Sequence, residues 1–212
     1  MNKGIKIGIG VPLSHENVPF AFLESLIAMR KPTNFILIRA SGYVGIANMR
    51  NQLVKAALEN DCSHLLFLDI DHYHNPETMT RLLSHNKPIV AGLSFMRTEP
   101  YEPAMFRGQI NSYKTVTEWE KNSLIEVDTV GCAAMLVQTE VFKKIGEPYF
   151  QFMKNPNPDI PYDIGEDVCF CNKAKEFGYK IYVDTALPNK HMGYIGVDED
   201  FWRIWTRGQN EL

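Results

Sequence analysis

The 212-residue sequence lacks a long apolar run and a recognisable leader segment. Its longest apolar run, residues 131–137, is far shorter than the about 18 residues that indicate a membrane-spanning helix. Lys6 interrupts the first apolar stretch, and no small-residue cleavage site follows it. We therefore expect no transmembrane segment and a cytoplasmic location.

The sequence also lacks a positive excess and a disulfide framework. It has 22 Lys and Arg against 25 Asp and Glu, for a net charge of −3. This balance argues against general nucleic-acid binding, which leaves a basic footprint. Four cysteines in a chain of this length do not suggest paired bridges. The Cys169-x-Cys171 pair lies in a helical pattern, which favours two reduced structural thiols over a redox or metal pair.

What is present is the composition of an ordinary globular protein, 45% hydrophobic and 22% charged, with one domain over residues 1–212 as the leading expectation. Apolar strands are expected at residues 4–11, 34–39, 64–68 and 88–95. Helical periodicity separates them, over residues 18–30, around 49–58 and from Asn75 onward. Strands that are apolar on both faces and alternate with helices indicate a mostly parallel α/β sheet covered on both sides.

After residue 96 the pattern becomes mixed and rich in loops. We expect short strands within 101–121, strands at 124–130 and 132–137, a helix at 139–145, a proline-rich loop at 148–161, a helix at 165–177 and a strand at 180–184. Because no repeat or linker separates residues 1–96 from 97–212, the two halves are expected to share one core.

The most informative segment is Asp69-Ile70-Asp71, directly after an apolar strand. Carboxyl ends of parallel strands form the edge at which ligands bind, and two repelling acids there favour a cation or a shared proton. A turn that caps the next helix is an equally good interpretation. His72 and His74 either join a His/Asp metal cluster or belong to a turn on the rim of the site, and the rim is favoured.

Two further segments are weak signals by themselves. Glu166 and Asp167 begin a helix, where acids are favourable whatever their function. His191 is either a metal ligand or a core histidine, and the core interpretation is favoured when it is taken alone.

The order of these segments along residues 4–193 is more specific than any one of them. It resembles the GT-A glycosyltransferases, in particular the family 2-like branch in its compact bacterial and phage form. The quoted segments are the strand ending at Pro12, Ala47-Asn48-Met49-Arg50-Asn51, Asp69-Ile70-Asp71, Gly165-Glu166-Asp167, the segment from Gly178 to Asp184, and His191.

The resemblance implies a GT-A, Rossmann-like fold with a nucleotide-binding half and an acceptor-side half. It implies an inverting, metal-dependent transfer from a nucleotide-sugar, with UDP favoured and GDP possible, to a glycan or other hydroxyl acceptor, with Mn²⁺ or Mg²⁺ as cofactor. The residue roles that it implies are a base pocket at Val11, Pro12 and Arg39, nucleotide contacts at Arg50, Asp69 and Ile70, metal ligation by Asp71 and His191 with Asp69 nearby, and acceptor-side catalysis by Asp167, the expected base, and Glu166. Acceptor recognition is expected from a partner or from the tail 197–212. The loop 148–161 and the segment Trp202-Arg203-Ile204-Trp205 are candidate aromatic surfaces, although Trp202 and Trp205 are favoured to pin a C-terminal helix to the core.

Two other functions remain open. A nucleotidyltransferase that makes a nucleotide-sugar uses similar acids, but it needs a basic glycine-rich loop after the first strand, and Gly8-Ile9-Gly10-Val11-Pro12 carries no Lys or Arg. A non-catalytic scaffold that binds nucleotide or glycan would keep the same fold.

Overall fold

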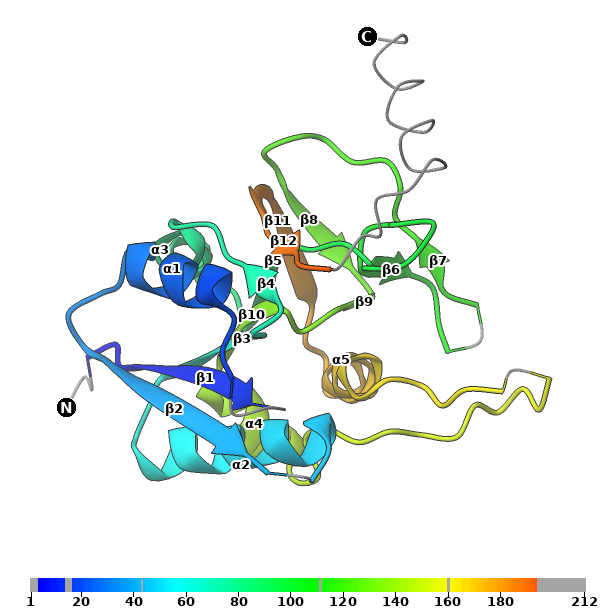
Figure 1. Cartoon of the computed structure of the whole chain (residues 1–212). Coiled ribbons are helices and arrows are strands. Elements are labelled where there is room, and N and C mark those ends of the chain that lie inside the picture. Colours follow the sequence, from blue (N-terminus) through cyan, green and yellow to red (C-terminus); the bar gives the residue numbers. More distant parts are fainter. Residues whose placement is uncertain (1–3, 14–16, 43, 111, 160, 194–212) are drawn as a thin grey trace, which may run out of the picture.

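The computed structural model describes residues 4–13, 17–42, 44–110, 112–159 and 161–193 (Figure 1). Its helices are α1 (Phe20–Ala28), α2 (Ile46–Glu59), α3 (Thr78–Ser84), α4 (Thr139–Ile145) and α5 (Glu166–Glu176). Its strands are β1 (Ile7–Leu13), β2 (Phe35–Ser41), β3 (His64–Leu68), β4 (His72–Tyr73), β5 (Ile89–Leu93), β6 (Met105–Arg107), β7 (Lys114–Thr115), β8 (Leu124–Val127), β9 (Thr129–Val130), β10 (Ala134–Gln138), β11 (Ile181–Pro188) and β12 (Lys190–His191).

A mostly parallel central sheet organises the described residues, as predicted. Its seven strands run in the order β2-β1-β3-β10-β5-β11-β8. Pairing is parallel between β1 and β2, β1 and β3, and β5 and β11. The carboxyl ends of β1 and β3 therefore lie side by side, where ligands bind in open α/β sheets.

Strand β10 differs from the purely parallel arrangement that the first half of the sequence indicates. It inserts between β3 and β5 and is antiparallel to both. Between β5 and β10 the chain forms β6, β7 and β9 of a separate three-stranded sheet, and β8, which pairs antiparallel with β11 at the edge of the central sheet. An apolar strand carries no information about its direction, so the sequence could not have revealed this insertion.

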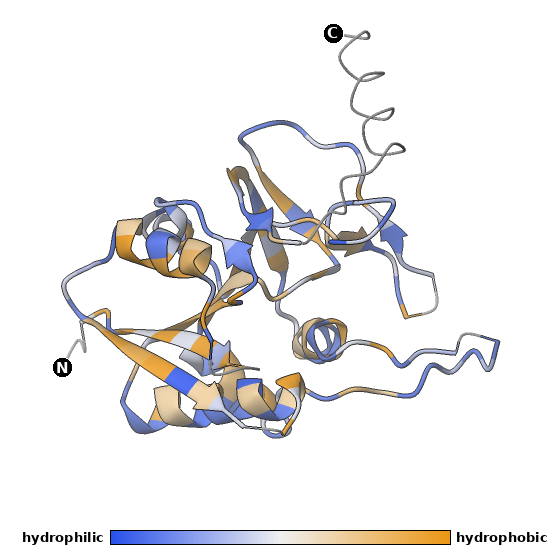
Figure 2. Cartoon of the chain, viewed as in Figure 1, coloured by the Kyte–Doolittle hydropathy of each residue, from blue (hydrophilic) through white to orange (hydrophobic). Residues whose placement is uncertain are grey.

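Helices cover both faces of the sheet, with α1 and α3 on one side and α2 and α4 on the other (Figure 1). Two clusters of buried apolar side chains fill these two faces. Glycines in β1 allow α2 to pack closely: a Cβ at Gly10 would lie 3.0 Å from Leu65 Cδ1 and 3.3 Å from Leu53 Cδ1. Figure 2 shows the resulting apolar strands at the centre of the molecule.

Edge strand β2 corrects the expectation that every strand is covered on both faces. Ile38 and Ala40 are buried on the side of α2, whereas Phe35 and Leu37 are 39% and 59% exposed. An edge strand needs burial on one face only, and a continuous apolar run does not distinguish it from a central strand.

Several expected elements have the predicted bounds, including β3 and α4. Helix α3 begins later than expected because Asn75 closes a turn: its side-chain oxygen accepts from the Glu77 backbone N–H at 2.9 Å. All four cysteines are free and buried, as expected for structural thiols. In the part of the chain that the structure describes, no helix has the length and apolar character needed to cross a membrane.

Candidate functional site

A cavity of about 990 Å³ lies at the carboxyl edge of the sheet. The predicted site residues Arg50, Asp69, Ile70 and Asp71 line it, and Pro12 at the end of β1 lines it from the neighbouring strand. The cavity therefore gathers the residues that follow β1 and β3 with a side chain from the first turns of α2.

Asp69 belongs to a buried ion-pair network around Arg50. Arg50 Nη2 donates to both Asp69 oxygens, at 3.0 and 2.9 Å, and Nη1 lies 3.2 Å from Glu166 Oε1. Burial raises the pKa of Asp69 and of Glu166, although the Arg50 charge opposes the shift in each. Burial alone would lower the pKa of Arg50, but the surrounding acids, Asp69 foremost, raise it. We call Arg50, Asp69 and Glu166 the Arg50 network.

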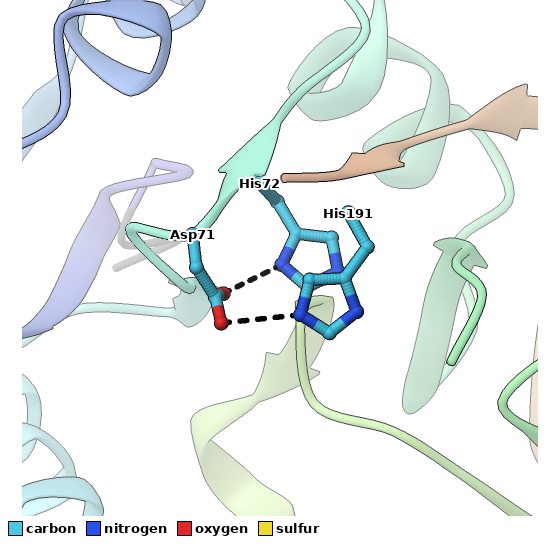
Figure 3. Close-up of side chains that lie close together, drawn as sticks. All are labelled: Asp71, His72 and His191. Atoms are coloured by element: carbon cyan, nitrogen blue, oxygen red, sulfur yellow. Dashed lines mark hydrogen bonds and ion pairs between the residues drawn. The ribbon is translucent and has the colours of Figure 1, made fainter. Parts of the chain in front are cut away.

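Asp71, two residues after Asp69, belongs to a different group of side chains. Its Oδ1 lies 2.8 Å from His72 Nδ1, and its Oδ2 lies 3.1 Å from His191 Nε2 (Figure 3). The two imidazoles stack with centroids 4.0 Å apart. Burial alone would raise the pKa of Asp71, but the hydrogen bonds from His191 and His72 outweigh it and lower the pKa well below its usual range. We call Asp71, His72 and His191 the Asp71 cluster.

A short two-stranded ribbon brings His191 to Asp71 from the far end of the described chain. Strands β4 and β12 pair antiparallel with His191 opposite His72, and the Met192 N–H donates to the Asp71 carbonyl at 2.7 Å. His191 Nδ1 lies 2.8 Å from the Phe95 carbonyl, which can only accept, so Nδ1 carries a proton. The hydrogen bond from Nε2 to Asp71 then requires the doubly protonated imidazolium, and His191 offers a lone pair at Nε2 only when that proton is lost.

The Asp71 cluster fits a divalent transition metal. Its three ligand atoms all lie within 4.8 Å of one another. One carboxylate and two imidazoles form a donor set suited to such ions, and the Phe95 carbonyl fixes the ring of His191 as outer-shell partners of metal ligands do.

The interpretation of His72 and His74 as a turn on the rim is wrong, since both are buried. His72 belongs to the Asp71 cluster. His74 lies outside it and bonds the Asp69 carbonyl through Nε2 at 3.0 Å. Burial lowers the pKa of His74 to about 4, so this imidazole is neutral at pH 7.

Glu166 and Asp167 begin α5, as the sequence indicates. Glu166 is buried against Arg50, whereas Asp167 is half-buried and its Oδ1 accepts from the Val168 N–H at 2.8 Å. Its Oδ2 lies toward the backbone of Gly131, 3.8 Å from where a Cβ would stand. Glu166 connects to the cavity through Arg50, which lines it, and neither Glu166 nor Asp167 is among the described residues that line the cavity.

The expected base pocket is assembled only in part. Pro12 lines the cavity, but Val11 is buried in the core and Arg39, its register partner on β2, is exposed. Neither Val11 nor Arg39 lines the cavity among the described residues. The tail 197–212, one candidate for acceptor recognition, lies outside the residues that the structure describes.

The other acceptor candidate, the proline-rich segment between α4 and α5, extends away from the sheet (Figure 1). Met153 and Ile164 pair across its base, and Phe152 and Tyr162 are exposed by 52% and 69%. Both aromatic rings are therefore open to solvent.

Sequence reasoning missed Arg97 and Thr98, which also line the cavity. Arg97 Nη1 lies 3.4 Å from Asp71 Oδ2, and the arginine side chain is half-exposed. Their place in the sequence could have identified them, because both residues come shortly after the carboxyl end of β5. This strand pairs parallel with β11 in the same sheet, and ligands bind at the carboxyl ends of such strands.

Solved structures with similar folds are glycosyltransferases of the GT-A class. A197 from STIV matches 91% of this chain and 87% of its own, with a TM-score of 0.63 and 20% identity. GalNAc-T7, solved with UDP, GalNAc and Mn²⁺, matches 92% of this chain and 45% of its own, with a TM-score of 0.62 and 12% identity. S. aureus TarS 1–349, solved with UDP-GlcNAc, matches 94% and 64%, with a TM-score of 0.54 and 18% identity. The chain therefore has the GT-A fold, as predicted.

No family model matches the sequence. Procollagen galactosyltransferase 2 of Homo sapiens is 22% identical over 165 residues, and that of Mus musculus is 23% identical over 166. Each match covers 74% of this chain and 25% of the relative, so the chain spans about a quarter of the length of these curated relatives. The fold and these distant relatives together support a GT-A glycosyltransferase.

Proposed function

We propose that this protein is a metal-dependent inverting glycosyltransferase that transfers a sugar from a UDP-sugar to an acceptor hydroxyl. The observation that carries the proposal is the cavity at the carboxyl edge, which is lined by Arg50 and Asp69 of the Arg50 network and by Asp71 of the Asp71 cluster. Nucleotide-sized ligands bind at this edge in open α/β sheets. That GalNAc-T7 was solved with UDP and TarS with UDP-GlcNAc supports uracil over guanine as the base.

Asp71, His191 and His72 are the residues that would hold the cation. A divalent cation there would offset the negative charge that develops on the leaving diphosphate. Two imidazoles among three ligands favour Mn²⁺ over Mg²⁺, which prefers oxygen ligands. The Mn²⁺ in the GalNAc-T7 structure agrees with this choice.

The chain's own side chains then bind and orient the donor. The Arg97 guanidinium is half-exposed at the cavity wall and donates to the diphosphate. Asp69 accepts from a donor hydroxyl, since its carboxylate is held in place by Arg50 and lines the cavity. A donor held at a fixed distance from the acceptor loses little entropy on reaction.

Asp167 acts as the base on the acceptor side. It takes the proton of the acceptor hydroxyl while the hydroxyl oxygen bonds to the anomeric carbon and the bond to the diphosphate oxygen breaks. This single displacement inverts the anomeric centre. Glu166 is the poorer candidate for base because it is buried and paired with Arg50.

Calorimetric titration of UDP and of GDP, each with and without Mn²⁺, tests the proposal. We expect UDP to bind only when Mn²⁺ is present, and GDP to bind more weakly. Release of UDP from UDP-galactose and UDP-GlcNAc, followed with water as the acceptor, then tests the transfer chemistry.

Metal-independent binding of UDP would contradict the role of the Asp71 cluster. Failure of both nucleotides to bind under every condition would favour the non-catalytic scaffold. Pyrophosphate release from UTP and a sugar phosphate would instead identify the nucleotidyltransferase.

A further inference from the structure

We propose that Arg50 is a positioning residue, a single buried guanidinium that ties donor-side Asp69 to the acceptor-side pair of Glu166 and Asp167. The sequence resemblance assigned Arg50 to nucleotide contact, and the geometry points to a different role. This inference rests on the proposed function, because it concerns the distance between the donor and the acceptor base.

The guanidinium nitrogens of Arg50 contact protein side chains and are not directed to a ligand in the cavity. Nη2 donates to both Asp69 oxygens, and Nη1 faces Glu166 at 3.2 Å. Nε and Nη1 are inaccessible to solvent and have no hydrogen-bond partner among the described residues. The guanidinium carbon lies 5.9 Å from the centre of the Phe150 ring. Arg50 therefore has no accessible donor besides the one that Asp69 already occupies.

The network joins elements that are far apart in the chain. Asp69 follows β3, Glu166 is the first residue of α5, and Arg50 lies on α2. Because Asp167 is the next residue of α5, the position of this helix start sets the position of the proposed base. One guanidinium thus fixes the position of Asp69, on the donor side, relative to the start of α5, which carries the proposed base.

The next residue, Asn51, connects α2 to the start of the proline-rich segment between α4 and α5. Asn51 Oδ1 accepts from the Tyr149 and Phe150 N–H groups at 3.1 and 2.9 Å, and its Nδ2 donates to the Phe150 carbonyl at 2.8 Å. The Phe150 ring packs between Phe67 of β3 and Phe170 of α5, with centroids 5.3 and 4.7 Å away. Asn51 thereby holds the segment whose Phe150 ring contacts β3 and α5, the two elements whose acids Arg50 pairs with.

Charge explains why an arginine is needed at this point. Asp69, Glu166 and Asp167 are all close enough to Arg50 for their negative charges to raise its pKa. Without the Arg50 charge, the three acids would repel one another in a poorly hydrated space. Lysine would keep the charge but could not hold two carboxylates in a planar fork.

The test compares the wild type with Arg50→Lys, Glu166→Gln and the double variant. Lys55→Met is the matched control, because Lys55 lies on the same helix in an exposed pair with Glu147. Two quantities are measured for each protein: the Kd of UDP with Mn²⁺ by calorimetry, and kcat for UDP release from UDP-galactose with water as the acceptor.

We expect Kd to stay within about 3-fold in both single variants while kcat falls about 10-fold to 100-fold, the size of loss that misplacement of a reacting group produces. The double variant should lose little more than either single variant, because both changes break the same link. Lys55→Met should match the wild type in both quantities.

A Kd that weakens in step with kcat would make Arg50 a nucleotide ligand and overturn the proposal. Unchanged kcat in Glu166→Gln, or additive losses in the double variant, would overturn it as well. Should Arg50→Lys fail to fold, the Kd and kcat of Glu166→Gln decide by the same criteria.

A measurement without substrate separates this proposal from the proposed function. Backbone amide exchange at the start of α5 should rise in Arg50→Lys and in Glu166→Gln, relative to Lys55→Met, whether or not UDP binds. If the wild type binds no UDP, the proposed function fails and the exchange data still test the link. Unchanged exchange at α5 would show that Arg50 does not position it.

Discussion

Asp69 and Asp71 follow the same strand end, yet the structure gives them opposite surroundings. Asp69 is 21% exposed at the cavity and is paired with a buried arginine, and burial raises its pKa. Asp71 is 40% exposed and faces two imidazoles, which together lower its pKa despite burial. The difference teaches that two acids one residue apart can enter separate interaction networks: Asp69 pairs with Arg50, and Asp71 lies with two imidazoles in a group that could hold a metal ion.

The largest expected effect on UDP binding comes from removing the carboxylate of Asp71. Asp71→Ala removes the only carboxylate of the Asp71 cluster. We expect Mn²⁺-dependent UDP binding to disappear, with Kd weakened by about 100-fold or more, which is the upper range for loss of a metal-site partner. Calorimetry measures the binding, and circular dichroism checks that the fold is retained.

Glu140→Ala is a suitable control for Asp71→Ala, since Glu140 is an exposed acid paired with Lys143 on α4. It should bind UDP as the wild type does. Full UDP affinity in Asp71→Ala would remove the distinction between the two acids and place the metal elsewhere.

The next effect concerns Asp167, the proposed base. Asp167→Asn keeps the shape of the side chain and removes its ability to take a proton. Turnover with UDP-galactose should fall by about 10²-fold to 10⁴-fold, the usual contribution of a general base, while the Kd of UDP stays within about 2-fold.

Glu176→Gln, at the exposed far end of α5, is the control for Asp167→Asn and should retain full turnover. Turnover of Asp167→Asn near the wild-type rate would mean that another group accepts the proton.

The smallest expected effect on activity comes from a third buried acid, Asp184, which is paired with an arginine as Asp69 is but does not line the cavity. Arg81 Nε and His85 Nε2 each lie 2.6 Å from Asp184 Oδ2. Asp184→Asn should leave turnover unchanged and lower the free energy of unfolding by about 2 kcal/mol at pH 7, as expected for hydrogen bonds to a charged group. Urea unfolding measures this difference.

The same variant has a defined pH dependence. Burial alone would raise the pKa of Asp184, but the hydrogen bonds from Arg81, His85 and the Ala186 N–H outweigh it and lower the pKa. A lowered folded pKa stabilises the protein above the unfolded pKa of about 4, and this stabilisation is lost as the pH falls toward the folded pKa. The difference between wild type and Asp184→Asn should therefore narrow below about pH 4. A difference that stays constant from pH 7 to pH 3 would contradict the assignment.

The residues of the candidate site were not equally predictable from the sequence. The positions of Asp69, Asp71, Glu166 and Asp167 at a strand end and a helix start follow from local patterns, and the structure places them there. His72 was harder to assign, because neighbours in a strand point to opposite faces. Asp71 lies in the turn before β4, so its carboxylate and the His72 ring converge.

Strands β4 and β12 could not be predicted, since two residues are too short to show a period. Their pairing nevertheless decides the site, because it holds His191 opposite His72. The antiparallel direction of β10 was hidden for a related reason: it depends on where the chain re-enters the sheet, and no local pattern encodes this.

The sequence by itself determined the class of sheet, the main helices and the strand end that carries Asp69 and Asp71. These features depend on local apolar periodicity and on turn-forming residues, which a single sequence displays. Only the tertiary structure decided that Arg50 is enclosed by Asp69 and Glu166, that His191 meets Asp71, and that Arg39 is exposed and does not line the cavity. These outcomes depend on contacts between distant segments, whose distances and burial are set by how the sheet and helices pack.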